Sequence, residues 1–137
     1  MTICSFDITD YDEVLALWKR CGGVGLSDTD SKEAIKVYLE RNPAMSFIAK
    51  AGGKIVGVIL GGHDGRRGSI HHLAVDVDWR RCGIARQLVE NCLGALKASG
   101  IRKTHIFVFT NNESGIAFWK SVGWTYRSDI GVISKTM

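Results

Sequence analysis

The chain has 137 residues, of which 45% are hydrophobic and 23% charged, and its length and composition are those of a single globular domain covering residues 1–137. It shows no signal peptide, and its longest apolar stretch (Ile55–Leu60) is too short to cross a bilayer. Its four cysteines lack C-x-x-C spacing, which argues against a metal site and indicates a cytoplasmic protein with reduced thiols. The net charge of +4 indicates an anionic partner, and nucleic acid, a membrane surface and a phosphorylated cofactor all satisfy it at this point.

The first third of the chain predicts a strand followed by two helices. Residues 2–8 alternate loosely and predict the strand. Asp10, followed three residues later by Glu13, resembles a capping box at the start of the first helix, which ends at Gly22-Gly23. The second helix is expected to start at Asp30 and Glu33 and to end at Asn42-Pro43, because the residue before a proline is pushed out of the helical region.

The middle of the chain predicts three strands and then the longest helix. The strands are expected at residues 45–51, 54–60 and 69–76, and Gly52-Gly53 is a hairpin signal between the first two. The helix is expected at about 82–99, with Gly100 as its stop.

The last third predicts a strand, a helix and two short strands. The strand is expected at 104–110, Asn112 is the predicted cap of a helix ending at Gly123, and the short strands are expected at 124–127 and 131–135. The whole order predicts a mixed α/β domain with a central, mostly antiparallel mixed sheet of about six to seven strands, flanked by about four helices.

The turn Arg80–Ala85 is the first candidate binding site. It joins a strand to a long helix and matches the pattern [Gln/Arg]-x-x-Gly-x-[Gly/Ala], in which Gly83 would let a phosphate approach the free backbone N–H groups of the helix start. Arg80, Arg81 and Arg86 would add planar cationic donors. The turn has neither the Gly-Lys-[Ser/Thr] of a Walker loop nor the three glycines of a dinucleotide fingerprint. The alternative interpretation is a solvated basic helix start without a ligand.

Two blocks of the sequence resemble the signatures of one family. The stretch Leu73–Arg86 resembles the acetyl-CoA-binding motif of the GCN5-related N-acetyltransferases, and Asn112 with Ala117–Trp124 resembles the second signature, Asn-x4-Ala-x-Tyr-x3-Gly-[Phe/Tyr/Trp]. The chain resembles small bacterial members of this family that are ribosomal-protein-alanine-acetylase-like or uncharacterised. The resemblance covers the whole chain and implies an acyl-CoA N-acyltransferase fold with acetyl-CoA as the acetyl donor.

The resemblance also implies which residues hold the donor. The fourth and fifth strands would splay apart, and the pantetheine arm would pair in the gap with backbone groups at Leu73 and Val75, like an added strand. The pyrophosphate would rest on the amides from Arg81 to Arg86, and Asn112 would contact the arm. The implied set is Leu73, Ala74, Val75, Arg80, Arg81, Cys82, Gly83, Ile84, Ala85, Arg86, Asn112 and Trp119.

For catalysis, the family implies direct attack of an amine on the thioester, with the Val75 amide as the donor to the oxyanion. Where relatives have a tyrosine that protonates the departing thiolate, this chain has Trp119, whose indole N–H has no useful acidity. Trp119 is therefore either a packing residue of the core or a contact of the cofactor arm.

The general base is not fixed by the family pattern. Ser69 and Phe107 stand where some relatives have a glutamate. By strand alternation, His71 shares the face of Ser69 and His105 that of Phe107, whereas His72 should face away from the Ser69 side. His71 and His105 are the candidate bases, and structural histidines are the alternative interpretation of both.

Three functional hypotheses follow. The first is an acetyl-CoA-dependent transfer to a primary amine of a small molecule or peptide, with no membrane and no nucleic acid involved, in a possible homodimer. The second is an acetyl-CoA-binding sensor of the same fold without strong catalysis. The third, a basic nucleic-acid-binding domain, fits poorly because the arginines concentrate at one helix start. Residues 21–39 and the terminal strands would recognise the acceptor, and Asp28 and Asp30 would attract a cation or, as we favour, cap a helix.

Overall fold

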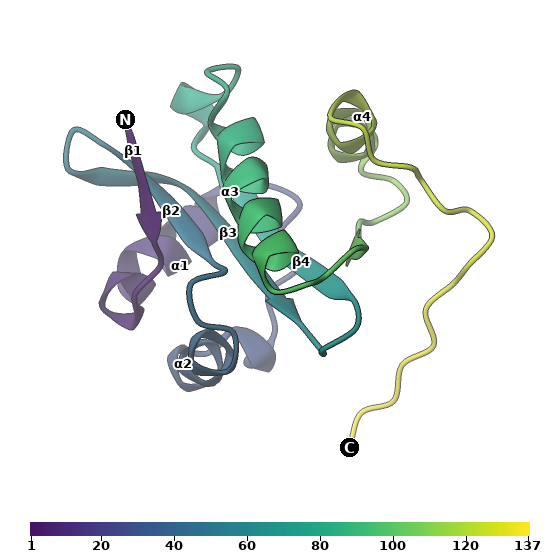
Figure 1. Ribbon diagram of the computed structural model, residues 1–137. Coiled ribbons are helices and arrows are strands. Elements are labelled where there is room, and N and C mark those ends of the chain that lie inside the picture. The colour runs from purple at the N-terminus through teal and green to yellow at the C-terminus, as the bar shows by residue number, and fades with distance from the viewer. The chain divides into compact units, whose positions relative to one another are not determined.

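The computed structural model describes all residues, 1–137, and the chain divides into two compact units, residues 1–107 and 108–137. The larger unit holds one sheet, three α-helices and three short 3-10 turns, and the smaller unit holds one α-helix (Figure 1). No helix is both long enough and apolar enough to cross a membrane.

The sheet has five strands in the order β1-β2-β3-β4-β5. Neighbouring strands are antiparallel except β4 and β5, which are parallel, so the expectation of a mostly antiparallel mixed sheet is confirmed. The strands are β1 Thr2–Ser5, β2 Phe47–Ala51, β3 Lys54–His63, β4 Gly68–Val75 and β5 Thr104–Ile106.

Helices cover both faces of the sheet. In Figure 1, α3 crosses in front of the sheet and α1 lies behind it. The register of β3 explains this, because Val58 and Leu60 join the core cluster with Trp18 of α1, whereas a Cβ at Gly57 would meet Ile84 of α3 at 3.0 Å. The helices of the larger unit are α1 Tyr11–Arg20, α2 Lys32–Arg41 and α3 Ile84–Ala98.

The capping residues of the first two helices differ from those predicted. Asp7 and Asp10 form a reciprocal capping box around a 3-10 turn, Ile8–Asp10, that precedes α1. Glu13, the predicted partner of Asp10, accepts a hydrogen bond from the backbone N–H of Ile55 at 2.6 Å and so ties α1 to β3. A second box encloses the turn Asp28–Asp30, and Ser31 caps α2. Each helix forms as predicted, but its start is preceded by a separately capped turn.

Strand β4 contains a β-bulge. Val58 of β3 lies opposite Ala74, and Leu60 lies opposite His71, so a single β3 residue faces both His72 and Leu73. His72 has a positive φ of 50°, an uncommon backbone conformation for a residue with a side chain. The bulge divides β4 into two parts with different surroundings.

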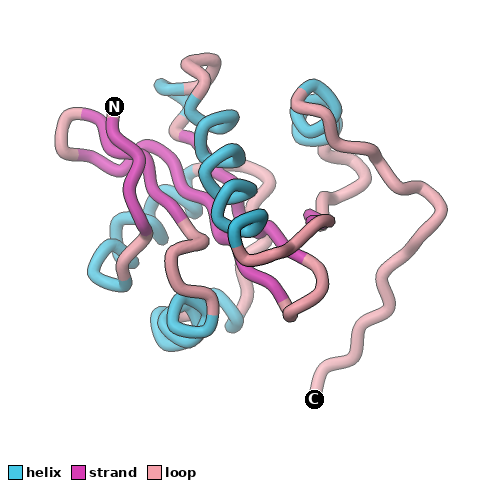
Figure 2. Tube along the Cα trace, in the orientation of Figure 1, coloured by secondary structure: helices cyan, strands magenta, loops and turns pink.

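The smaller unit contains α4, Glu113–Ser121, and no strand. Asn112 caps this helix as predicted, because its Oδ1 accepts from the N–H of Gly115 at 3.0 Å. Gly123 (φ 95°) ends it, and the N–H of Trp124 donates to the carbonyl of Trp119 at 3.0 Å. After α4 the chain runs to its C-terminus as loop (Figure 2).

The prediction of six to seven strands is therefore wrong, because the last two predicted strands are absent and the sheet has five. Residues 124–127 and 131–135 find no ladder partner, and a strand exists only where its backbone groups are paired. Trp124 packs its ring against Trp119, with centroids 4.6 Å apart, and Arg127 forms a two-bonded ion pair with Asp129. The strand expected at 104–110 ends at Ile106, since the carbonyl of Phe109 accepts from the N–H of Asn112 in a turn.

Candidate functional site

The second part of β4 has one open edge. Strand β5 pairs with β4 only through Gly68, Ser69 and Ile70, whereas β4 continues to Val75. From His71 onward, only β3 pairs with β4. This is the edge along which the family resemblance implies that an extended ligand binds.

The backbone of Val75 faces this open edge. Val75 lies opposite Gly57 and Ala74 opposite Val58, and the N–H of Asp76 donates to the carbonyl of Val56 at 2.8 Å. Ala74 and Asp76 therefore hold the hydrogen-bonded positions of this antiparallel ladder, and Val75 holds a non-hydrogen-bonded one. The carbonyl of Val75 instead accepts from Arg80 Nε at 3.1 Å and from Cys21 Sγ at 3.6 Å. Because the N–H and C=O of a strand residue point to the same side, the N–H of Val75 also points away from β3. The role predicted for this amide, as oxyanion donor, stays a prediction.

The start of α3 gathers backbone donors and positive charge. Gly83 is the N-cap with φ 79° and offers no side-chain cap, and the first helical bond runs from Gln87 N–H to the Gly83 carbonyl. The N–H groups of Ile84, Ala85 and Arg86 therefore have no partner within the helix. The dipole of this 15-residue helix adds positive potential.

The arginines of this turn are all solvent-exposed. Arg80, Arg81 and Arg86 flank the three donor amides, and Arg81 has a positive φ of 62°. Cys82 is exposed as well, and its Sγ donates to the Arg80 carbonyl at 3.6 Å. The predicted helix start near 82 is thus shifted to Ile84, and the preceding residues form the loop in which the pattern places the phosphate.

Glycine at position 57 allows α3 to lie against β3 at this place. A Cβ on Gly57 would stand 3.0 Å from Ile84 Cγ2 and 3.0 Å from Leu88 Cδ1. Ile84 and Leu88 are both buried, so the side chains of the first two turns of α3 anchor it in the core. The amides of its first turn are held in place by this packing.

The bulge turns two consecutive histidines toward the same side of the sheet. The ring of His71 lies against Tyr38 of α2 with centroids 6.0 Å apart, and that of His72 against Trp18 of α1 at 5.1 Å. The two imidazole centroids are 6.5 Å apart. The expectation that His72 faces away from the Ser69 side is therefore wrong, because the extra residue of the bulge breaks the period of two.

His71 has the electrostatic surroundings of a neutral imidazole. Burial lowers its pKa below the usual 6.5, the neighbouring His72 lowers it further, and Asp30 opposes them. At neutral pH one ring nitrogen therefore keeps a lone pair for an incoming proton. Tyr38 remains protonated beside it, because burial raises the pKa of its phenol well above the usual range.

Asp30 is buried and has more partners than its capping role requires. Its Oδ2 accepts from the backbone N–H of Ser27 at 3.0 Å and so closes the capping box of the turn before α2, whereas α2 itself is capped by Ser31. Its Oδ1 lies 2.8 Å from His72 Nε2, and its carbonyl accepts from the Tyr11 hydroxyl at 2.7 Å. The contact with His72 could not be predicted from local sequence patterns, because it depends on the bulge; the adjacent pair His71-His72 was the available signal.

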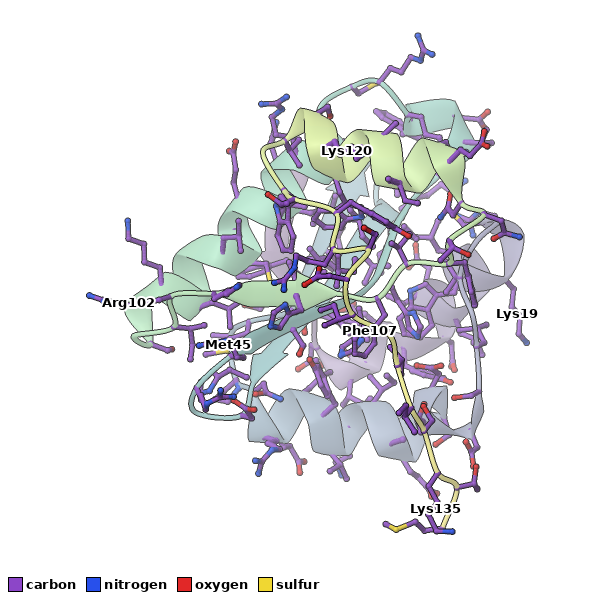
Figure 3. All side chains as sticks on the ribbon, turned by 90° about the vertical axis from the view of Figure 1, so that its right-hand side faces the viewer. Lys19, Met45, Arg102, Phe107, Lys120 and Lys135 are labelled. Atoms are coloured by element: carbon purple, nitrogen blue, oxygen red, sulfur yellow. The ribbon has the colours of Figure 1, made fainter.

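His105 lies on the same face as His71. It is the parallel register partner of Ser69, which shares the face of His71 on β4, and it is partly buried. Phe107 lies beyond the end of β5, and 73% of its surface is exposed (Figure 3). The structure thus brings His71 and His105 to one side of neighbouring strands.

Asn112 and Trp119 belong to the smaller unit. The Oδ1 of Asn112 is engaged as the cap of α4. Trp119 is buried, and its ring lies against those of Phe118 and Trp124. This packing agrees with a structural role, and the cofactor contact predicted for each of the two residues stays a prediction.

Comparison with known proteins identifies the family. Residues 11–124 match the acetyltransferase (GNAT) family, and the chain belongs to it. It is 30% identical over 137 residues to an acetyltransferase of Sodalis glossinidius (100% of this chain, 96% of the relative) and 34% identical over 122 residues to one of Pectobacterium atrosepticum (89% and 86%). The chain is accordingly an N-acetyltransferase, and acetyl-CoA is the acetyl donor of its family.

Solved structures show the same fold. Ard1 from Thermoplasma volcanium superposes with a TM-score of 0.81 at 22% identity, covering 93% of this chain and 84% of that one. The ribosomal-protein-S18-alanine N-acetyltransferase from Escherichia coli gives 0.72 at 22% identity, with coverage of 89% and 76%. An aminoglycoside 6'-N-acetyltransferase from Acinetobacter haemolyticus gives 0.82 at 16% identity, with coverage of 100% and 99%. The predicted acyl-CoA N-acyltransferase fold is confirmed.

Proposed function

We propose that this chain transfers the acetyl group of acetyl-CoA to a primary amine by direct attack of the amine on the thioester. The observation that carries the proposal is the open edge of β4 at Val75, which is followed after a short loop by the uncapped start of α3. The family match spans 11–124 and so crosses the boundary between the two units, which supports one acetyltransferase domain over residues 1–137.

The donor would be held mainly by backbone groups. The pantetheine arm would pair with Leu73 and Val75 on the open edge, where Ala74 already pairs with β3. The pyrophosphate would accept hydrogen bonds from the amides of the turn and of the first turn of α3, with Arg80, Arg81 and Arg86 as cationic partners. The proposed donor-binding residues are those named from the sequence. Besides the residues above, they include Cys82, Gly83, Ile84 and Ala85 in the turn and Asn112 and Trp119 in the smaller unit.

The proton transfers would begin at a histidine. The acceptor arrives as an ammonium, loses one proton to His71 directly or through water, and attacks the thioester carbon. The C–N bond forms, the N–H of Val75 donates to the oxyanion, and the C–S bond then breaks. The proton lost by the new amide nitrogen reaches the CoA thiolate through water or the substrate, since the indole of Trp119 is no acid. His105, on the same face, is the second candidate for the base.

The pH dependence of the reaction follows from the base. His71 acts only while neutral, and its pKa lies below 6.5. We therefore expect kcat/KM to be nearly constant above pH 6.5 and to fall about tenfold per pH unit below the lowered pKa. The variant His71→Asn should lose this acidic limb, whereas His105→Asn should keep it; the reverse result would make His105 the base.

The experiment is a thiol-release assay on the full chain. Acetyl-CoA is offered with amines that represent the named acceptors of the structural neighbours, an aminoglycoside and a peptide with an N-terminal alanine, and with a simple diamine. CoA release well above the rate without protein supports the proposal. A melting temperature raised by acetyl-CoA would show binding. If no amine is turned over as well, the result would favour the acetyl-CoA sensor, the hypothesis suggested by Trp119 in place of the tyrosine.

The compartment, the oligomeric state and the absence of a nucleic-acid partner are further proposals. Four free cysteines, two of them exposed, fit a reducing cytoplasmic compartment. A homodimer is to be tested by light scattering on the same sample as the activity assay. Salt-dependent binding of DNA without any effect of acetyl-CoA on the melting temperature would overturn the proposal in favour of a nucleic-acid-binding domain.

A further inference from the structure

Two residues beside the proposed base have no role in the steps above. We propose that Asp30 and His72 form a positioning pair that fixes the orientation and the charge of His71. The inference rests on the proposed function only in naming His71 as the base. The pair itself is a property of the larger unit and is measurable without any substrate.

The pair is held in place from several elements. His72 Nε2 lies 2.8 Å from Asp30 Oδ1, and the two side chains are only 18% and 9% exposed. The other carboxylate oxygen of Asp30 accepts from the Ser27 N–H, and the Asp30 carbonyl accepts from the Tyr11 hydroxyl. Trp18 closes the other side of the imidazole with an edge-on ring contact. Poor access of water strengthens the electrostatic interaction between the two side chains.

The pair also stabilises the bulge. His72 adopts a φ of 50°, which residues with a Cβ rarely do unless the surrounding contacts hold them. The bond to Asp30 is such a contact. Because a one-residue slip of the register would turn the side chains of β4 to the other face, holding the bulge at His72 also keeps the neighbouring His71 against Tyr38.

The groups that surround His71 come from five elements: α1, α2, β4, β5 and the turn Asp28–Asp30. Tyr38 on α2 is protonated and neutral, α1 presents the uncharged Trp18, and His105 on β5 lies on the same face. His72 on its own strand disfavours a positive charge on His71, and Asp30 opposes this more weakly. His72 beside Asp30 thus opposes a positive charge on His71 and helps to keep its ring neutral and able to accept a proton.

The test is the ring titration of His71, followed by NMR in the substrate-free full chain. In His72→Asn, the new residue tolerates a positive φ and carries no charge, and its shorter side chain removes the bond that His72 Nε2 makes to Asp30. Because the lowering influence of His72 is removed and Asp30 stays in place, the titration midpoint of His71 should move to higher pH. An unchanged midpoint in the folded variant would overturn the inference.

Two further variants make the result decisive. His72→Gly adopts the bulge conformation without strain, loses the bond to Asp30, and should shift the midpoint in the same direction even if His72→Asn folds poorly. His63→Asn is the matched control; His63 lies at the end of β3 and bonds to the N–H of Gly65, so the midpoint of His71 should stay where it is in the unaltered chain.

The kinetics then separate this inference from the proposed function. The acidic limb of kcat/KM is measured with the amine that gives the fastest CoA release. If the NMR midpoint and the kinetic limb move together in His72→Asn, the positioning pair and the base are both supported. If only the midpoint moves, the pair stands and His71 is not the base. If the midpoint stays, the pair is refuted whatever the kinetics show.

Discussion

The two parts of strand β4 differ in the number of strands that pair with them. Residues Gly68–Ile70 pair with β3 on one side and with β5 on the other, whereas Ala74 and Val75 pair with β3 alone. The first part is saturated with backbone hydrogen bonds, and the second part leaves the N–H of Val75 directed outward. The bulge at His72 separates the two parts and turns both histidines toward α1 and α2.

The two kinds of pairing separate the structural part of β4 from the part that is available to a ligand. A fully paired strand has no backbone donors left, so changes there should act on stability. A strand paired on one side is a template for an extended ligand, so changes there should act on binding and catalysis. The four predictions below test this division, from the largest expected effect to the smallest.

Substituting alanine for Gly61 tests the part of β4 that is paired on both sides, Gly68–Ile70. Gly61 lies on β3 opposite Ile70, and an added Cβ would overlap Cys92 Sγ and the backbone carbonyl of Met45. The carbonyl cannot move without disturbing the strand, so we expect Gly61→Ala to lower the free energy of unfolding by about 3 kcal/mol or more. Urea unfolding measures it.

The control is a second glycine-to-alanine change. Gly94 lies within α3, and a Cβ there has nothing within 4 Å. Gly94→Ala should stabilise the chain by about 0.5–1 kcal/mol, because alanine loses less entropy than glycine in a helix. Equal stability of the two variants would contradict the packing assigned to Gly61.

A proline at position 75 tests the open edge. The N–H of Val75 makes no bond to β3, so its removal should leave the ladder intact. Without that donor the oxyanion loses its backbone partner, and we expect kcat to fall about 100-fold or more. Circular dichroism and thiol-release kinetics on Val75→Pro measure the fold and the activity.

Proline one residue earlier gives the contrast. The N–H of Ala74 faces Val58 in the ladder, so Ala74→Pro should unfold the sheet or lower its free energy of unfolding by about 3 kcal/mol. If Val75→Pro unfolds to the same degree, the N–H of Val75 is structural and the proposed oxyanion donor is wrong.

Reversing a charge at the start of α3 separates helix stability from donor binding. A glutamate in the first turn of a helix favours the dipole, but it repels a phosphate. We therefore expect Arg86→Glu to leave the melting temperature equal or slightly higher and to raise the KM for acetyl-CoA about tenfold.

Arg102→Glu is the matched control for that change in net charge. Arg102 is exposed in the loop between α3 and β5 and points away from the sheet (Figure 3). Its reversal should change the KM for acetyl-CoA less than twofold at physiological salt, where distant charges are screened. A similar rise in both variants would indicate a general charge effect in place of a phosphate site.

The smallest effect is expected in thiol reactivity. Cys82 is exposed in the turn before α3, whereas Cys92 is buried and burial raises the pKa of its thiol to about 12. Iodoacetamide should alkylate Cys82 and the exposed Cys4 readily and Cys92 very slowly. Added CoA should slow alkylation of Cys82 by a few-fold while leaving Cys4 unchanged; protection of neither or of both would place the donor elsewhere.

The sequence predicted most of the elements because their signals are local. Periodicity and stop residues identified α3 with its end at Gly100, where the N–H of Ile101 donates to the Leu96 carbonyl, and Asn112 as the cap of α4. The position of Arg80–Ala85 between a strand and a helix could also be predicted from the sequence. These features depend on residues within a few positions of one another.

The errors concern long-range pairing. Residues 131–135 carry strand-like side chains, but a strand also needs a partner, and no local pattern supplies one. The bulge at His72 depends on the register of β3 against β4, so alternation gave the wrong face for that residue. The contact between Asp30 and His72 follows from that bulge, so it also depends on the register and could not be predicted from local patterns.

The central claim is that the open edge of β4 and the first turn of α3 bind acetyl-CoA through backbone amides. Amide hydrogen exchange of the full chain, with and without a nonhydrolysable acetyl-CoA analogue, tests it most directly. The account predicts slower exchange at Val75 and at Ile84, Ala85 and Arg86, with no change at Ile70. Saturating analogue that leaves Val75 and the first turn of α3 unprotected would contradict it.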